Sequence, residues 1–272
     1  MEELKHQIEE WLSFCVRSFS PTTHIQYRCV ISQLLREISA NGKVFTQKSI
    51  EDFLDGKLQQ GYSRTQFNCY LICIRNFASW RKQKYNIPSP AHSIPFIKQD
   101  PPKQRVLSEE EYQLCLKHTK GIDNDIIAFL GNTGLRREEL RSLKWGDIPA
   151  DLKFIRIKGK GRKARIVPLN SICKEILQRY PRRPDEEYVQ FCRKYYGGEG
   201  SSWLCRKLAK QLNIPCFGCH AVRHFFATRC ILKGINIYKL SKILGHSSVQ
   251  TTEQIYLHLM PIDLLGITDV LD

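Results

Sequence analysis

A proline-rich stretch divides the sequence into two parts. Residues 86–105 contain five prolines and almost no regularly spaced apolar residues. Proline lacks a backbone N–H and fixes φ, so neither a continuous helix nor a central strand can run through this stretch. We therefore predict an extended linker between two domains. We place the domains at residues 1–95 and 105–272, with the linker proper at 96–104.

The part before the linker predicts four helices. Its apolar residues recur at helical intervals in four runs, near residues 4–15, 30–38, 50–58 and 67–77. The runs are separated by short segments rich in Gly, Ser and Pro. Pro21 follows Ser20, as expected for a first-turn proline behind a capping serine. This part should form a helical unit.

The part after the linker predicts a mostly helical domain with one small β-hairpin. Ser108 and Glu111 have the spacing of a capping box. Apolar residues alternate with basic ones on both sides of Gly159 and Gly161, which predicts two antiparallel strands joined by a turn. Further helices are expected at 124–134, 174–180, 201–212, 220–234, 236–245 and 251–259, with loops at 121–124 and 195–200. The predicted fold class is mainly α.

The charge favours a polyanionic partner. Lys and Arg number 42 and Asp and Glu 27, which gives a net charge of +15. Residues 1–97 carry 12 basic and 8 acidic side chains, a net +4, and residues 98–272 carry 30 and 19, a net +11. Residues 153–165, in the predicted hairpin, hold seven basic residues and no acid. A merely solvated turn is the alternative, but phosphate contact better explains so dense a positive charge.

Targeting and cysteine patterns indicate an intracellular, cytoplasmic protein without a membrane span. No apolar run approaches the roughly 18 residues that a transmembrane helix needs, and the N-terminus is acidic and amphipathic. The eleven cysteines are odd in number and scattered, which favours reduced thiols. The run Cys216 to His220 has the spacing of haem attachment or half a zinc site, but matched partner ligands and an export signal are lacking. No cofactor and no metal are predicted.

Four motifs together resemble one protein family. They are "TGLRREELRSLKWGDI" at 133–148, the hairpin, "HAVRH" at 220–224 and "LGHSSVQTTEQIY" at 244–256. In this order they resemble the tyrosine recombinase or phage integrase family in its compact Xer-like form. The resemblance covers residues 104–272 and, more loosely, the N-terminal part, which resembles the family's four-helix, SAM-like core-binding domain. The later part would then be the catalytic domain.

The resemblance implies a set of site residues. Glu139 falls on the acidic residue that supports the first arginine of the family's site. Between the later histidine and the tyrosine this chain has an interval of ten residues, where many relatives have nine. The implied catalytic residues are Arg136, Lys160, His220, Arg223, His246 and Tyr256.

These residue types suit metal-free cleavage of a phosphodiester. Arginine neutralises charge on nonbridging oxygens with a planar fork that keeps its proton, a role implied for Arg136 and Arg223. Those two side chains should meet around one phosphate. Lys160, on the hairpin turn, would protonate the departing 5′ oxygen.

A tyrosine hydroxyl has a pKa of about 10, so it is a poor nucleophile at neutral pH unless a base or a positive field assists it. His220 would accept the proton of Tyr256, and His246 would hydrogen-bond the phosphate. Alternatively, either histidine is only a structural hydrogen-bond donor. Thr251 and Gln254 have capping-box spacing, which predicts that the last helix starts just before Tyr256 and places its hydroxyl in the first turn.

The resemblance implies a site-specific DNA recombinase, or integrase. It would cleave and rejoin double-stranded DNA through a 3′-phosphotyrosyl intermediate and a Holliday junction, acting as a homotetramer on two DNA sites. Two alternatives stay open: DNA relaxation of the type IB topoisomerase kind, and a catalytically inactive DNA-binding relative. The apolar tail at 257–272 would dock on a neighbouring subunit or fold back on its own domain.

Overall fold

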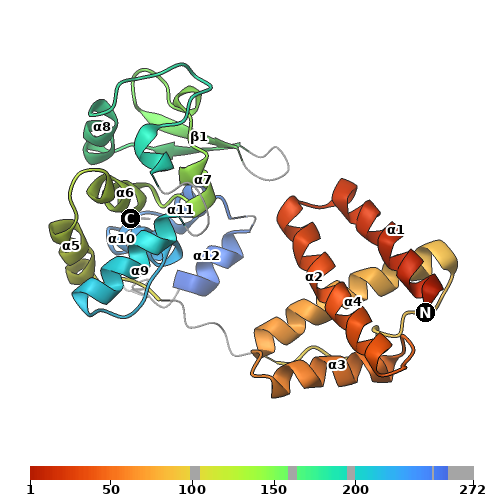
Figure 1. Cartoon of the computed structure of the whole chain (residues 1–272). Coiled ribbons are helices and arrows are strands. Elements are labelled where there is room, and N and C mark those ends of the chain that lie inside the picture. Colours follow the sequence, from red (N-terminus) through yellow and green to blue (C-terminus); the bar gives the residue numbers. More distant parts are fainter. Residues whose placement is uncertain (99–104, 159–163, 195–199, 247, 257–272) are drawn as a thin grey trace, which may run out of the picture. The chain divides into compact units, whose positions relative to one another are not determined.

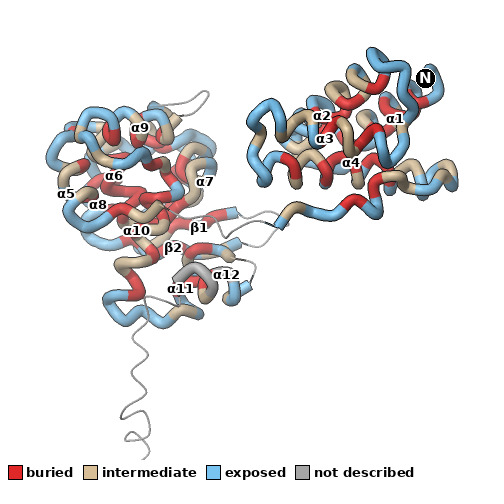
Figure 2. Tube along the Cα trace, turned by 90° about the horizontal axis from the view of Figure 1, so that it is seen from below, coloured by how far each residue is buried: buried red, intermediate tan, exposed pale blue. Residues whose placement is uncertain are grey.

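The computed structural model describes residues 1–272 apart from 99–104, 159–163, 195–199, 247 and 257–272. In the last helix, the side chains of residues 251 and 254–256 also lie outside the described part. The chain divides into two compact units, Met1–Pro102 and Lys103–Asp272. Each unit has its own buried core (Figure 2). The predicted fold class, mainly α with one small antiparallel sheet, is confirmed.

The first unit contains the four predicted helices (Figure 1). Ser20 caps the second of them by accepting a hydrogen bond from the backbone N–H of Thr23 at 3.3 Å, with Pro21 in the first turn. Ser63 caps the fourth in a capping box with Gln66. The helices are α1 (Glu2–Ser18), α2 (Pro21–Ala40), α3 (Gln47–Gln59) and α4 (Arg64–Tyr85).

An aromatic cluster holds these helices together. Trp11 of α1 stacks on Tyr27 of α2, with ring centroids 5.4 Å apart, and packs tilted against Phe77 of α4 at 5.2 Å. Only 1% of Trp11 and 1% of Phe77 is exposed. Such aromatic side chains bury more apolar area than any other type, so this cluster anchors the core of the unit.

The segment after α4 packs on the first unit, and most of the predicted linker proper, 96–104, lies outside the described residues. Residues 86–97 form no helix or strand, as expected, but they pack back on α4. Arg75 donates from Nε to the carbonyl of Ala91 at 3.1 Å, and the Asn68 side chain exchanges two hydrogen bonds with the backbone of Ile97. Ala91 is fully buried. The extended stretch is therefore largely part of the first unit, because its apolar residues complete that unit's core.

The second unit combines helices with one hairpin. The predicted loop at 121–124 is wrong, because a helix already begins at Ile122 behind Gly121, whose φ is 55°. The predicted loop at 195–200 lies, up to residue 199, outside the described residues. The elements are α5 (Glu109–His118), α6 (Ile122–Thr133), α7 (Arg137–Arg141), η1 (Trp145–Asp147), β1 (Phe154–Lys158), β2 (Ala164–Pro168), α8 (Ser171–Gln178), η3 (Gln190–Arg193), α9 (Ser201–Leu212), α10 (Cys219–Leu232), α11 (Ile237–Leu244) and α12 (Val249–Tyr256).

Helix α6 lies at the centre of this unit. Its residues from Asp125 to Gly131 are buried, and α8 and α10 pack against it. The hairpin pairs Ile155 with Val167 and turns both toward the core. A smaller apolar cluster joins α10 to α11, which fixes where α11 ends relative to the rest.

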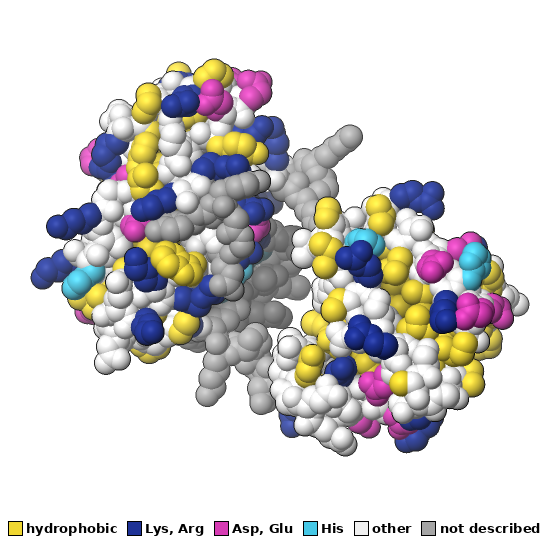
Figure 3. Space-filling model, in the orientation of Figure 1, with side chains coloured by type: hydrophobic (Ala, Val, Ile, Leu, Met, Phe, Trp, Pro, Cys, Tyr) yellow, Lys and Arg dark blue, Asp and Glu magenta, His cyan; other side chains and the backbone are white. Residues whose placement is uncertain are grey.

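Surface charge agrees with the composition. On the face shown in Figure 3, Lys and Arg side chains are spread over the second unit, and acidic ones are fewer. Among the helices of the described part, none has both the length and the apolar character that crossing a membrane requires.

Candidate active site

Arg136 lies at the junction between two helices. Helix α6 ends at Gly134 with a φ of 62°, a conformation that glycine adopts without strain. A Cβ at this position would approach Phe226 to 2.3 Å, so space also requires glycine here. Arg136 then caps α7, and both its backbone N–H and its Nη1 donate to Glu139, at 2.7 and 2.9 Å.

Arg223 lies on α10 and is 5% exposed. Its Nη1 donates to the carbonyl of Gly134 at 2.7 Å, and its Nη2 donates to the carbonyl of Leu244 at 2.6 Å. A buried charge is costly unless hydrogen bonds compensate it. These two carbonyls contribute to that compensation.

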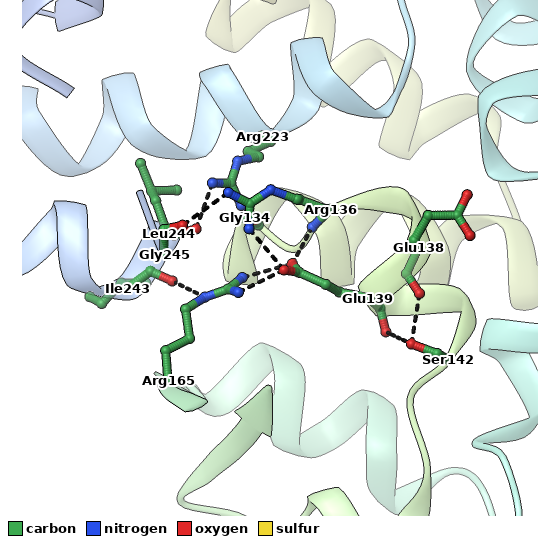
Figure 4. Close-up of polar contacts among 10 residues, drawn as sticks. All are labelled: Gly134, Arg136, Glu138, Glu139, Ser142, Arg165, Arg223, Ile243, Leu244 and Gly245. Atoms are coloured by element: carbon green, nitrogen blue, oxygen red, sulfur yellow. Dashed lines mark hydrogen bonds and ion pairs between the residues drawn. The ribbon is translucent and has the colours of Figure 1, made fainter. Parts of the chain in front are cut away.

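The end of α11 brings three arginines together (Figure 4). The last carbonyls of a helix have no partner within the helix and carry partial negative charge, so cations are favoured there. Three consecutive carbonyls each accept from a different guanidinium: Ile243 from Arg165 at 2.7 Å, Leu244 from Arg223 at 2.6 Å and Gly245 from Arg136 at 3.1 Å. We call Arg136, Arg165 and Arg223 the arginine clamp. The predicted meeting of Arg136 with Arg223 is thus present.

Glu139 balances part of this charge. Arg165 donates to both of its carboxylate oxygens, at 2.6 and 2.7 Å. Burial by itself would raise the pKa of Glu139, but the hydrogen bonds from Arg165 and Arg136 outweigh burial and lower that pKa to about 2. Glu139 is therefore ionised throughout the physiological range.

His246 follows directly after Gly245, whose carbonyl is the last of the three that bind the clamp. Its Nδ1 is 2.7 Å from the hydroxyl oxygen of Thr252, which is fully buried. Burial, followed by the charges of Arg223 and Arg136, lowers the pKa of His246 to about 4. At neutral pH the ring is uncharged, so it acts as a hydrogen-bonding group.

His220 is in the first turn of α10 and remains accessible to solvent. Partial desolvation, then the charges of Arg223 and Arg136, lower its pKa below the usual 6.5. A neutral imidazole beside two arginines can accept a proton, which a charged imidazolium cannot.

The side chains of two predicted site residues lie outside the described part of the structure. Lys160 falls between β1 and β2 in the sequence and is outside the described residues. The side chain of Tyr256 is also outside them. The predicted start of the last helix is wrong. Helix α12 begins at Val249, where the Ser248 hydroxyl oxygen accepts from the N–H of Gln250 at 3.2 Å. Tyr256 is its last described residue, so the backbone of Tyr256 lies at the end of this helix and not in its first turn.

Two further sequence expectations are refined. The dense positive charge of 153–165 predicts phosphate contact for its basic residues, but the side chain of Arg165 is 10% exposed and points inward. In the Cys216 to His220 run, Cys216 is exposed and Cys219 is buried, and all eleven cysteines are free. The described residues include no group of three or more His, Cys, Asp or Glu that could hold a metal ion.

Sequence reasoning missed the roles of Arg165 and Thr252. For Arg165 a signal exists, because it precedes the buried Val167 by two positions and so belongs to the inward face of its strand. For Thr252 no local pattern exists, since its contact depends on the path of the turn between α11 and α12.

Comparison with known proteins shows which family the chain is similar to. Residues 105–261 match the model of the phage integrase family. The chain is 25% identical to tyrosine recombinase XerD of Halalkalibacterium halodurans, over 95% of this chain and 94% of that protein. It is 30% identical to tyrosine recombinase XerA of Thermococcus onnurineus, over 94% of this chain and 92% of that protein.

Solved structures share the fold. The Tn1549 transposon integrase in complex with transposon right end DNA matches with a TM-score of 0.69 and 18% identity, over 92% of this chain and 94% of that chain. A lambda integrase dimer bound to a core site matches with a TM-score of 0.71 and 17% identity, over 91% and 96%.

Proposed function

This chain belongs to the phage integrase family, and from that premise we propose that it breaks and rejoins DNA strands at specific sites through a 3′-phosphotyrosyl intermediate. The observation that supports this most directly is the meeting of Arg136 and Arg223 on consecutive carbonyls at the end of α11. Two guanidiniums from separate segments, placed side by side, form a site for one phosphate group.

The clamp leaves Arg136 able to bind a ligand. A guanidinium has five N–H donors, and Arg136 uses two of its side-chain nitrogens for Glu139 and Gly245. Its side chain is 38% exposed. The remaining donors would hold a nonbridging oxygen and stabilise the charge that builds up as the nucleophile attacks.

The proposed cleavage step conserves protons and bonds. The Tyr256 oxygen attacks phosphorus, its proton passes to His220, and the P–O5′ bond breaks as Lys160 protonates the leaving oxygen. His246, neutral at neutral pH, donates a hydrogen bond to the phosphate. The phosphodiester is exchanged for a phosphotyrosyl ester, so a free 5′ hydroxyl of a second strand can reverse the step without external energy.

Joining strands from two duplexes requires more than one protomer. We infer a homotetramer on two DNA sites that passes through a Holliday junction. Each protomer's basic second unit, with a net +11 over 98–272, would carry the heavier share of phosphate contacts.

A trapping assay tests the nucleophile. DNA held covalently by the protein in cells is sequenced to give the site, and a nicked version of that site, whose released fragment diffuses away, traps the intermediate. Wild-type protein should form an adduct that survives denaturation. Tyr256→Phe should still shift the DNA in a gel and form no adduct.

The matched control is Tyr238→Phe, which alters a 56% exposed tyrosine on α11 and should preserve capture. An adduct formed by Tyr256→Phe would refute the assignment. Supercoil relaxation without exchange between two marked duplexes would instead support the topoisomerase alternative, and DNA binding with no adduct in the wild type would support the inactive one.

A further inference from the structure

Arg165 is the member of the arginine clamp that the proposed reaction does not use. It projects from β2, and all three of its side-chain nitrogens bond inside the protein. Nε donates to the carbonyl of Ile243 at 2.7 Å, and the two Nη atoms form a fork on Glu139 at 2.6 and 2.7 Å. Its side chain is only 10% exposed. All the side-chain nitrogens of Arg165 are thus bonded within the protein, whereas the side chain of Arg136 is 38% exposed.

Glu139 links Arg165 to Arg136. The same carboxylate accepts from the backbone N–H and from Nη1 of Arg136. A bidentate pair fixes both the position and the plane of a carboxylate. By fixing Glu139, Arg165 sets the direction from which Arg136 is held, and with it where the other N–H groups of Arg136 point.

The hydrogen bond from Arg165 to Ile243 links Arg165 to the segment before His246. Ile243 lies in the last turn of α11, two residues before Gly245 and three before His246. Arg165 therefore links β2 to the segment that carries His246. One guanidinium thus connects the hairpin, the start of α7 and the end of α11 (Figure 4).

Gly245 shows that the backbone accommodates this arrangement. Its φ is 67°, and a Cβ there would lie 2.7 Å from Cδ and 3.0 Å from Nε of Arg165. Real Cβ atoms do not approach so closely, so any other residue would displace Arg165. The sequence thus meets a conformational and a packing requirement at one position.

We propose that Arg165 is a positioning residue for DNA cleavage, holding Glu139 and the end of α11 so that Arg136 and His246 keep their places around the phosphate. This inference rests on the proposed function. It distinguishes Arg165 from the exposed basic residues of the same hairpin, such as Arg156 on β1, which are available to the DNA backbone.

The test separates cleavage from binding. Single-turnover cleavage of the trapping substrate is measured at saturating protein, and the dissociation constant for DNA is measured separately. Arg165→Gln should slow cleavage on the order of 10- to 100-fold, because small misplacements of reacting groups cost that much, with DNA affinity within about twofold. Arg183→Gln, the matched control, removes the same charge from a side chain that is 53% exposed and lies outside both the hairpin and the clamp. It should preserve the cleavage rate.

A double-mutant cycle identifies the route. If Arg165 acts through Glu139, Arg165→Gln combined with Glu139→Gln should cleave no more slowly than the slower single variant. Arg165→Lys keeps the charge but lacks the planar fork, so it should recover only part of the rate. It carries the test if Arg165→Gln does not fold.

The outcomes distinguish the two proposals. Wild-type adduct formation combined with wild-type rates in Arg165→Gln, or in Arg165→Lys if only that variant folds, would overturn the positioning role and leave the recombinase function intact. A loss confined to DNA affinity would make Arg165 a phosphate ligand and also overturn it. Failure of the wild-type protein to form any adduct would instead count against the proposed function.

Discussion

Replacement of Glu139 by Gln tests the energetics of the clamp. The carboxylate accepts four hydrogen bonds from two arginines, and its pKa is lowered from 4.5 to about 2. At about 1.4 kcal/mol per pKa unit, this shift corresponds to about 3 kcal/mol of folding free energy. Glutamine would leave the Arg165 fork facing an N–H₂ group, so we expect Glu139→Gln to lose about 3 kcal/mol near neutral pH.

The sign of the pH dependence follows from linkage. A carboxylate whose folded pKa is below its unfolded pKa stabilises the fold above the unfolded value, and it loses this contribution as the pH falls toward the folded value. The difference between wild type and Glu139→Gln should therefore be constant above about pH 5.5 and shrink to about 1.5 kcal/mol near pH 3. Comparing the two proteins cancels the titration of the other carboxylates.

Urea denaturation followed by circular dichroism, at a series of pH values, measures this difference. The two units are fitted with separate transitions, and the one containing α7 should shift. Glu138→Gln is the matched control, because Glu138 pairs with Arg137 and Arg141 at the surface with 54% of its side chain exposed. Exposed pairs contribute ~0–1 kcal/mol, so the control should lose little. Equal losses in the two variants, or a pH-independent difference, would refute the reasoning.

Three further predictions follow. Gly245→Ala should lower the rate of DNA cleavage and destabilise the second unit more than Gly234→Ala does, because both positions have positive φ but only Gly245 has a side chain within 4 Å; equal melting temperatures for the two variants would contradict this. Thr252→Val keeps the shape but removes the hydrogen bond to His246, so single-turnover cleavage should fall about 10-fold with DNA affinity unchanged, as the loss of about 1.4 kcal/mol implies. Because the pKa of His220 lies below 6.5, the acid limb of the cleavage rate should lie below pH 6.5, and an acid limb above that value would rule out His220 as the proton acceptor.

Local signals in the sequence determined the helices and many of their ends. Ser20, Ser108 and the proline-rich stretch act through the backbone of neighbouring residues, so their effects can be read from a few consecutive positions. The motif residues were likewise identifiable by type and order. The grouping of Arg136 with Arg223 is implied by the resemblance to the tyrosine recombinase family, and the chemistry of phosphate binding explains why arginine suits both positions.

The predicted start of the last helix is wrong because the local signals there are ambiguous. Thr251 and Ser248 are both acceptable caps, and the sequence offers no means of ranking them. In the structure, Ser248 caps the helix and the Thr252 hydroxyl is committed to His246. The contact with His246 depends on the turn that brings residues 246 and 252 together, which is a property of the folded chain.

Tertiary structure alone decided what each arginine binds. By type, Arg165 and Arg156 are equivalent basic residues of one hairpin. The sequence itself determined that this segment is a hairpin, because alternation and glycine turns act over a few residues. Only the fold decided that Arg165 meets a carboxylate from α7 and a carbonyl from α11, because those partners lie 26 and 78 residues away along the chain and approach it only when the core has packed.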